Sequence, residues 1–398
     1  MNTLKKVYCR AFQTAFRLLI PILPYREPEL LDGMQAVADT LKKHDKQSVM
    51  VVTDSVIRSL GLTKGLEESL EESKIDYVVF DETVANPTFA NVEKARELYL
   101  EKNCQALIAF GGGSPMDCAK AIGARVACPN KNLKQMKGIL KVRKKTPLMI
   151  AIPTTAGTGS ETTLAAVITD EATHHKYPIN DFSLIPDYAV LAPEVTVGLP
   201  PQLTATTGMD AMTHAVEVYI GRSMTKSTKA ASIEAVQIII DNLEKVYQDG
   251  KNLEARKNML RAAYLAGTAF TKSYVGYVHA VAHSLGGKYG IPHGLANAVL
   301  LPHVLRAFGD SVTDSLADLA KKVGLVGAEV STADAAEAFI CKVEEMNAAM
   351  NIPTKLEGVK EEDIKPLAVF ADKEANPLYP VPTLWDAEEL EQLYKRVM

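Results

Sequence analysis

The sequence lacks the features that mark membrane and nucleic-acid-binding proteins. Near the N-terminus the uninterrupted apolar run 18–24 is far shorter than the ~20 residues that a membrane-spanning helix needs. The net charge is −4, from 44 basic and 48 acidic residues, and there is no basic domain or stripe of the kind that nucleic acid requires. We therefore expect no nucleic-acid partner and no integral membrane association.

Cysteine is also scarce. The five cysteines are scattered and form no Cys-x-x-Cys pair, so they predict neither a disulfide framework nor a cysteine-rich metal site. An odd, scattered set is typical of free thiols in a reducing compartment. We therefore expect a cytoplasmic protein.

What the sequence does contain is the composition of a globular protein with two domains. Its 398 residues, 47% apolar and 23% charged, can bury an ample core without cross-links. In the first half, short β-rich runs alternate with helical stretches, which predicts a mostly parallel sheet with helices on both faces. The expected strands are 48–54, 77–81, 106–114, 148–155, 165–170 and 188–193.

After about residue 197 the pattern changes, because helical runs follow one another and no further strand is expected. The sequence thus predicts an α/β domain with an N-terminal extension over 1–197 and an all-α domain over 198–398. The extension, 1–24, is basic and apolar, but no small-residue cleavage site follows it. We expect an amphipathic helix that packs on its own chain or on a partner subunit, with peripheral membrane contact as the alternative.

Two loops that follow expected strands could bind a cofactor. GGGSPMDCAK (111–120) opens a helix, with Ser114 as its expected N-cap, and the N–H groups at a helix start attract phosphate. It is not a G-x-G-x-x-G fingerprint, so a tight turn without a ligand is the alternative. PTTAGTGSE (153–161) can donate hydroxyl and backbone hydrogen bonds to a pyrophosphate or ribose. Ligands bind where parallel strands end, so we expect a dinucleotide at these loops.

Asp54 ends the first of these strands. A carboxylate there would accept a hydrogen bond from an adenosine ribose 2′-hydroxyl and repel a 2′-phosphate, which favours NAD(H) over NADP(H). The alternative is that Asp54 only caps the helix that follows.

Histidines and one aspartate form the clearest candidate for a metal site. Asp210 and His214 are four residues apart, as are His279 and His283, so each pair projects from one face of a helix. His293 lies in a Pro-His-Gly turn. One carboxylate, from Asp210, with three imidazoles, from His214, His279 and His293, suits Fe²⁺, and Zn²⁺ or another divalent ion is possible. Any one histidine could instead be a packed core residue, but the combined spacing favours a metal.

GGGSPMDCAK, PTTAGTGSE, DAMTHAVE and HAVAHSLGGKYGIPHGLANA together resemble the iron-containing (group III) alcohol dehydrogenase family, and the likeness runs from about residue 45 to the end. The resemblance implies a dehydroquinate synthase-like two-domain architecture, with a Rossmann-like dinucleotide-binding domain and a helical metal-binding domain. It also implies a homo-oligomer, a dimer or higher, that acts on a small alcohol or aldehyde. Hydride transfer would occur with the metal polarising the substrate oxygen.

Carried over residue by residue, the resemblance assigns roles to individual side chains. The metal ligands it implies are Asp210, His214, His279 and His293, and His283 matches a catalytic pocket position. The cofactor contacts it implies are Asp54, Asn86, Gly112, Gly113, Ser114, Asp117, Thr154, Thr155, Thr163 and Lys176.

This chain departs from the family pattern at its N-terminal end. Family members begin with a short strand and a Phe-Gly-x-Gly turn, whereas this chain reads LPYREPELLDG after an extra helix, so the mode of dimerisation stays open. Two other functions also stay open. One is a metal- and NAD-dependent lyase or cyclase resembling dehydroquinate synthase, although such enzymes need basic residues around a phosphorylated substrate and Lys288 is the main one here. The other is a non-catalytic metal or cofactor sensor.

Overall fold

The computed structural model describes residues 1–171 and 175–398. It divides into two compact units, an α/β unit of Pro24–Gly198 and a helical unit of Leu199–Met398 together with Met1–Leu23. The expected boundary falls one residue away, but the expected first domain includes the N-terminal extension. In the structure that extension belongs to the helical unit, because its side chains bind the C-terminal part of the chain.

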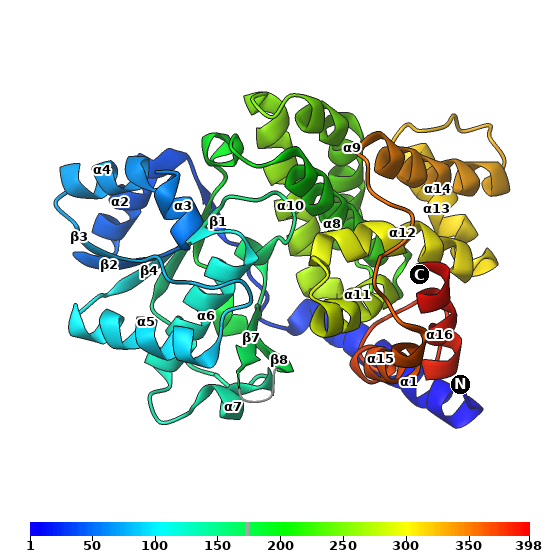
Figure 1. The fold of residues 1–398 in the computed structure, drawn as a ribbon, viewed down its shortest axis with the longest axis horizontal. Coiled ribbons are helices and arrows are strands. Elements are labelled where there is room, and N and C mark those ends of the chain that lie inside the picture. Colours follow the sequence, from blue (N-terminus) through cyan, green and yellow to red (C-terminus); the bar gives the residue numbers. More distant parts are fainter. Residues whose placement is uncertain (172–174) are drawn as a thin grey trace. The chain divides into compact units, whose positions relative to one another are not determined.

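The α/β unit is built on a six-stranded sheet in which all pairings are parallel (Figure 1). From edge to edge the order is β1 (Glu29–Leu31), β9 (Tyr188–Val190), β6 (Leu148–Pro153), β4 (Ala106–Gly111), β2 (Ser48–Val52) and β3 (Asp76–Phe80). The chain passes from β2 to β3 on one side and then crosses to β4 on the other. The winding therefore reverses between β2 and β4, and at such a switch point the loops diverge and leave room for a ligand.

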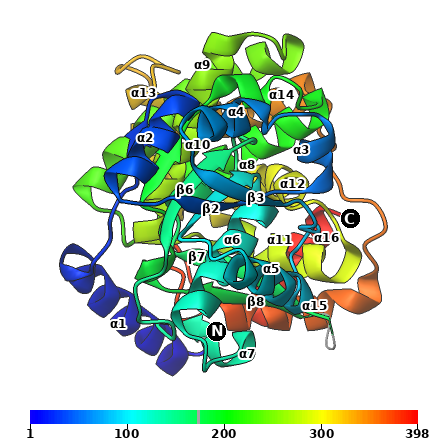
Figure 2. The same ribbon diagram turned by 90° about the vertical axis from the view of Figure 1, so that its left-hand side faces the viewer.

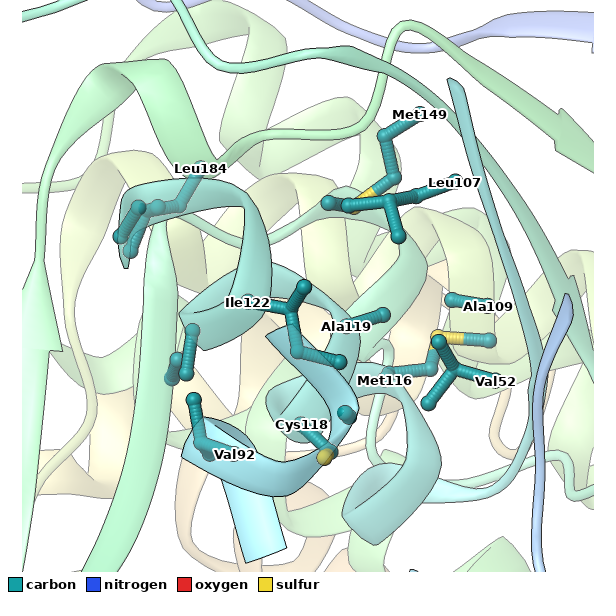
Figure 3. Close-up of a cluster of buried hydrophobic side chains, with 14 of the residues drawn as sticks. Val52, Val92, Leu107, Ala109, Met116, Cys118, Ala119, Ile122, Met149 and Leu184 are labelled. Carbon is teal, nitrogen blue, oxygen red and sulfur yellow. The ribbon is translucent and has the colours of Figure 1, made fainter. Parts of the chain in front are cut away.

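Helices cover both faces of this sheet. One face carries α2 (Gly33–Lys43), α3 (Ser55–Ser59) and α4 (Lys64–Glu72), and the other carries α5 (Phe89–Glu101) and α6 (Gly113–Ala127). Figure 3 shows the second face, where Met116, Ala119 and Ile122 of α6 pack in one buried cluster with Leu107 and Met149 of the central strands. The packing fixes the start of α6 at the end of β4, where a ligand would bind.

A second, smaller sheet lies in the same unit. It is formed by β5 (Gly138–Ile139), β8 (His175–Asn180) and β7 (Ala165–Asp170), with the short α7 (Leu133–Met136) before it. All six expected strands are confirmed, but the one at 165–170 pairs antiparallel with β8 instead of joining the main sheet. The chain also forms a short opening strand, since Glu29–Leu31 is β1 and pairs with β9 at the sheet edge.

The helical unit contains α8 to α16, and no strand follows β9 in the described residues. These helices are α8 (Pro201–Ile220), α9 (Lys226–Gln248), α10 (Leu253–Ser273), α11 (Tyr277–Tyr289), α12 (His293–Phe308), α13 (Asp310–Lys322), α14 (Thr332–Ala349), α15 (Glu361–Ala375) and α16 (Ala387–Arg396). The expected fold class, a mostly parallel α/β domain followed by an all-α domain, is confirmed. In residues 1–171 and 175–398 no helix has both the length and the apolar character to span a membrane.

The helix α8 is the centre of this unit, buried along nearly its whole length. It packs against α9, α10 and α12, which surround it, and Figure 2 gives a second view of this group. A helix buried on all sides is normally apolar all round. The polar residues that α8 does bury, Asp210, Thr213, His214 and Glu217 among them, therefore need partners.

Candidate active site

Three of the expected metal ligands meet at one point in the helical unit. Asp210 lies on α8, His279 on α11 and His293 at the first position of α12. The ligand atoms of these side chains all lie within 4.8 Å of one another. Asp210 Oδ1 is 3.5 Å from His293 Nε2 and 3.8 Å from His279 Nε2. One carboxylate and two imidazoles thus face a common point, as they would around a divalent cation.

The side-chain amide of Asn297 marks that point. Its Nδ2 lies 2.6 Å from Asp210 Oδ1 and 3.1 Å from the Nε2 atoms of both His279 and His293. Three acceptors that share a single donor are placed as they would be around one small cation. Both the position and the chemistry of this donor set therefore fit a divalent metal.

The fourth expected ligand, His214, stands beside this group. It lies one helical turn after Asp210 on α8 and is buried. Its ring stacks on His279 with centroids 4.5 Å apart and on Phe270 of α10 with centroids 4.1 Å apart. The structure thus brings three expected ligands together and places the fourth against one of them, with its ring stacked on that of His279.

The carboxylate of Glu217 holds His279 in place. Glu217 lies on α8, on the same side of the helix as Asp210. Its Oε2 is 2.6 Å from His279 Nδ1 and accepts a 2.8 Å hydrogen bond from Gly276 N, while its Oε1 accepts one of 2.8 Å from Val278 N. One side chain therefore caps the N-terminus of α11 and directs the other ring nitrogen of His279 toward Asp210.

Burial sets the protonation of this pair. Burial, with the neighbouring rings of His214, His293 and His283, lowers the pKa of His279 well below its usual range. Burial also raises the pKa of Glu217, while the backbone N–H groups that donate to it favour its carboxylate form. His279 is therefore neutral near pH 7, which is the form of imidazole that binds a metal.

His283, the expected catalytic residue, lies one turn after His279 on α11. Its ring stacks on that of His293 with centroids 5.0 Å apart, and its side chain is 40% exposed. Its Nδ1 is 2.6 Å from Glu374 Oε1 on α15, and the Tyr379 hydroxyl donates a 2.8 Å hydrogen bond to the same oxygen. The ring thus has a fixed orientation next to the three ligands and access to solvent.

In the α/β unit, most of the expected cofactor residues come after β2, β4 and β6, which are adjacent strands. Gly112–Ser114 follow β4 and Thr154–Thr155 follow β6. A Cβ added to Gly112 would lie 3.3 Å from Thr155 Oγ1, and one on Gly113 would lie 3.4 Å from Thr158 Cγ2. The two loops are therefore side by side, and the small size of glycine permits this approach.

The start of α6 differs from the expectation. The helix begins at Gly113 with Gly112 as its N-cap, so the expectation that Ser114 caps it is wrong. Ser114 Oγ instead accepts a 3.2 Å hydrogen bond from the backbone N of Asn86, another expected cofactor residue. Because the N-cap Gly112 has no side chain that could cap α6, N–H groups of the first turn can bind a ligand such as a phosphate.

Asp54 follows β2 and caps α3, because its Oδ1 accepts a 2.9 Å hydrogen bond from Ile57 N. The alternative interpretation, that Asp54 caps the helix that follows, is therefore confirmed. The cap uses one carboxylate oxygen, and the second can accept a hydrogen bond from a ribose. The position, at the carboxyl end of β2 next to the switch point, suits both roles.

Asp117 and Thr163 belong to a buried cluster around Lys120 that joins α6 to the second loop. Lys120 Nζ donates to the carbonyl oxygens of Ser160, Thr163 and Ala165 at 2.6, 2.9 and 3.0 Å. The Ser160 hydroxyl in turn donates to Asp117 at 3.1 Å. Burial raises the pKa of Asp117 to about 6 and lowers that of Lys120 to about 8. These side chains are engaged within the protein and fix the shape of the loop.

The remaining expected cofactor residues differ in exposure. Thr154 is buried, and its backbone N donates a 3.1 Å hydrogen bond to the Gly111 carbonyl oxygen. Lys176 is exposed on β8, where it pairs with Thr169 of β7.

Four side chains that the structure places in these groups were not predicted from the sequence: Glu217, Asn297, Glu374 and Lys120. Three of them have a signal in their spacing, since each lies three or four residues from an expected site residue and so shares a helix face with it. Glu374 is 91 residues from His283, and nothing in the local sequence points to that contact.

Comparisons with known proteins agree with this arrangement. The model described as iron-containing alcohol dehydrogenase matches residues 32–193, and that of the C-terminal part of the Fe-containing alcohol dehydrogenase family matches residues 204–398. The 1,3-propanediol dehydrogenase of Citrobacter freundii is 37% identical over 96% of this chain and 98% of that protein. The NAD-dependent methanol dehydrogenase of Bacillus methanolicus is 38% identical over 84% of this chain and 88% of that protein.

A solved structure of 1,3-propanediol oxidoreductase matches the fold with a TM-score of 0.90, at 36% identity over 94% of this chain and 99% of that one. This likeness confirms the dehydroquinate synthase-like two-domain architecture that the resemblance implies. The matches favour the dehydrogenase interpretation over the cyclase and sensor alternatives. The chain therefore belongs to the iron-containing alcohol dehydrogenase family and is an oxidoreductase.

Proposed function

We propose that this chain is a metal-dependent, NAD(H)-linked alcohol dehydrogenase and aldehyde reductase that acts on small alcohols or diols. The observation that carries the proposal is the convergence of Asp210, His279 and His293 on one point. Relatives named as 1,3-propanediol dehydrogenase, NAD-dependent methanol dehydrogenase and lactaldehyde reductase are 37%, 38% and 35% identical to it. All three names refer to short, polar molecules, which is why we propose this substrate class.

Asp210, His214, His279 and His293 would hold the metal, with Fe²⁺ favoured by the family and Zn²⁺ as the alternative. When bound, the metal supplies Lewis acidity toward the substrate oxygen, and the nicotinamide exchanges the hydride. The negative charge of Asp210 offsets part of the charge of the cation. Glu217 keeps His279 in the tautomer whose Nε2 can bind the metal.

We assign proton transfer to His283. Its ring lies against that of the ligand His293, and Glu374 fixes its orientation through Nδ1. The exposed part of the ring can exchange a proton with water, so the residue is suited to moving the proton of a substrate hydroxyl to solvent.

We propose that the cofactor is NAD(H) in preference to NADP(H). The support is the carboxylate of Asp54 at the end of β2, which would meet an NADP 2′-phosphate as a like charge. The N–H groups of the uncapped first turn of α6 would receive the pyrophosphate, and Asn86, Ser114, Thr154, Thr155 and Lys176 would complete the cofactor contacts.

We also propose that the enzyme works in the cytoplasm as a homo-oligomer, a dimer or higher. All five cysteines are free and four of them are buried, which is typical of a reducing compartment.

Steady-state kinetics test the proposed function. Protein loaded with Fe²⁺ without oxygen would be assayed with NADH and a panel of formaldehyde, propanal, 3-hydroxypropanal and lactaldehyde, and with the matching alcohols and NAD. We expect turnover of at least one pair, its loss after chelation, and its return when Fe²⁺ is added back. Fully loaded protein that turns over no member of the panel would contradict the proposal.

A further inference from the structure

The first helix, α1 (Thr3–Leu19), turns its apolar side outward. Large apolar side chains recur along one side of the helix and continue into the short turn after it, and we call them the α1 stripe. They are Leu4, Val7, Tyr8, Phe12, Leu18, Leu19 and Ile22. Leu4, Leu18 and Ile22 are 84%, 73% and 76% exposed, which is far more than large apolar residues usually are.

The opposite, inward side of α1 carries polar side chains that fix the helix to its own unit. Lys5 pairs with Asp372 of α15 at 2.7 Å, and Arg10 donates to the carbonyl oxygens of Val381 and Pro382 at 2.7 and 2.6 Å. The buried Gln13 donates to the Tyr379 carbonyl oxygen at 2.7 Å. Figure 1 shows α1 in blue beside α15. Surface helices normally bury their apolar side, so this reversed arrangement presents the α1 stripe to something outside the chain.

A groove of about 870 Å³ adjoins the α1 stripe. Its walls come from the helix, including Val7, Ala11 and Leu18, and from the segment 382–384. The apolar surface is therefore continuous from the helix onto the segment 382–384 of the same chain, as expected of a contact surface.

Charge distinguishes between the possible occupants of this surface. The first 26 residues contain five basic side chains and no acidic one, and two of the five, Lys5 and Arg26, pair with Asp372 and Asp187. Lys6 and Arg17 are exposed, and Arg10 lines the groove, so the basic residues border the α1 stripe. Two copies that packed α1 against α1 would bring these like charges together, whereas an anionic surface would meet charges of opposite sign.

We propose that the α1 stripe is a peripheral binding surface for membranes that contain anionic lipids. An amphipathic helix with a basic border lies in the headgroup region with its apolar side chains in the acyl boundary. Each basic residue near an anionic leaflet adds roughly a fivefold gain in affinity, and salt screens that gain. No residue of α1 belongs to the metal or cofactor groups, so this surface is independent of the proposed function.

Vesicle flotation of the full-length protein tests the proposal. We expect the wild type to float with vesicles of phosphatidylcholine mixed with phosphatidylglycerol, to float poorly with phosphatidylcholine alone, and to be released by high salt. Leu4→Gln with Leu18→Gln should weaken binding at least about tenfold. Lys6→Gln with Arg17→Gln should weaken it by about 25-fold on the mixed vesicles only.

Matched control variants make comparable changes at other exposed positions of the chain. Val56→Gln with Leu60→Gln removes side chains that are 64% and 61% exposed, and Lys144→Gln with Lys145→Gln removes two exposed charges. Both controls should float like the wild type, and all variants should keep the wild-type circular dichroism and aldehyde reduction rate.

Three outcomes would overturn the proposal. One is wild type that does not float with either kind of vesicle, and another is α1 variants that bind as well as the controls. The third is a wild type that does not bind vesicles, together with an oligomer that Leu4→Gln with Leu18→Gln dissociates in sedimentation equilibrium. The α1 stripe would then be a contact between copies of the chain.

Discussion

At the scale of single residues, the orientation of the proposed metal ligand His279 depends on its contact with Glu217. Three N–H groups point at the Glu217 carboxylate, so the amide of Glu217→Gln would turn a donor toward a donor. We expect this variant to lower metal affinity about 10- to 100-fold, the usual cost of losing such a partner. Competition with a chromophoric chelator measures that affinity.

Glu234→Gln, on the exposed side of α9, is the matched control and should bind metal like the wild type. Equal affinity in Glu217→Gln and the wild type would show that Glu217 only caps α11.

Asp54 has two possible roles that a pair of variants can separate. Asparagine caps a helix about as well as aspartate, so Asp54→Asn removes the charge and keeps the cap. We expect both Asp54→Asn and Asp54→Gly to relax the preference for NAD(H), because neither repels a 2′-phosphate. The measurement is the ratio of catalytic efficiencies with NADH and NADPH, and an unchanged ratio in Asp54→Asn would leave the capping role alone.

The residues that sequence reasoning identified are those whose chemistry shows in local spacing. Asp210, His279 and His293 could be recognised because carboxylate and imidazole side chains recur at helical intervals, and the structure brings them together. The cap of α6 was predicted at Ser114, whereas the structure has it at Gly112. The helix starts one residue before Ser114, at a glycine that has no side chain to signal a boundary. Glu374 could not be found, since its contact with His283 exists only after α15 packs on α11.

Among the elements, α12 approaches α8 through a glycine. A Cβ on Gly294 would lie 2.5 Å from the carbonyl oxygen of Thr206, a backbone atom that cannot move aside. We expect Gly294→Ala to cost about 1–3 kcal/mol of unfolding free energy and to displace His293, lowering metal affinity. Denaturant unfolding and metal titration check both effects.

Gly287 on α11 gives the control, because a Cβ there would meet nothing within 4 Å. Gly287→Ala should be neutral or stabilising by up to about 1 kcal/mol. Gly294→Ala that behaves in the same way would contradict the close packing of α8 and α12.

Asp318 on α13 ties that helix to α8 and α9. Burial raises its pKa, but hydrogen bonds from Lys229, Tyr219 and Lys322 outweigh burial and hold the pKa well below its usual range. A lowered pKa in the folded state means that the contact stabilises above the unfolded pKa of about 4 and is lost as pH falls through the folded value.

We therefore expect Asp318→Asn to lower the thermal midpoint at pH 7 and to differ less from the wild type as pH falls below about 4. Asp314→Asn, at an exposed position of the same helix, is the control. A difference between Asp318→Asn and the wild type that stays constant with pH would contradict this account.

The positions of helices and strands were predicted better than the pairing of the strands. Helical and strand periodicity located the central strands and most helices, because each pattern records one buried face. The pattern of 165–170 is that of a strand, but nothing in it says that the strand pairs with β8 in a second sheet. β1 and β5 are three and two residues long, too short for any periodicity to appear.

Across the whole molecule, each compact unit carries one part of the chemistry. The helical unit holds the group of Asp210, His279 and His293, and the α/β unit holds the loops after β2, β4 and β6. The change from alternating strands and helices to helices alone predicted where one unit ends. It could not predict that α1 joins the helical unit, because the contact of Lys5 with Asp372 spans 367 residues.

The most direct test of the account is the metal content of purified variants after anaerobic loading with Fe²⁺ and removal of free ions. We predict close to one ion per chain in the wild type and in His283→Ala, and little or none in Asp210→Asn and His293→Ala, all with native circular dichroism. Full occupancy in Asp210→Asn and His293→Ala, or loss of the ion from His283→Ala, would contradict the assignment of these residues as the metal site.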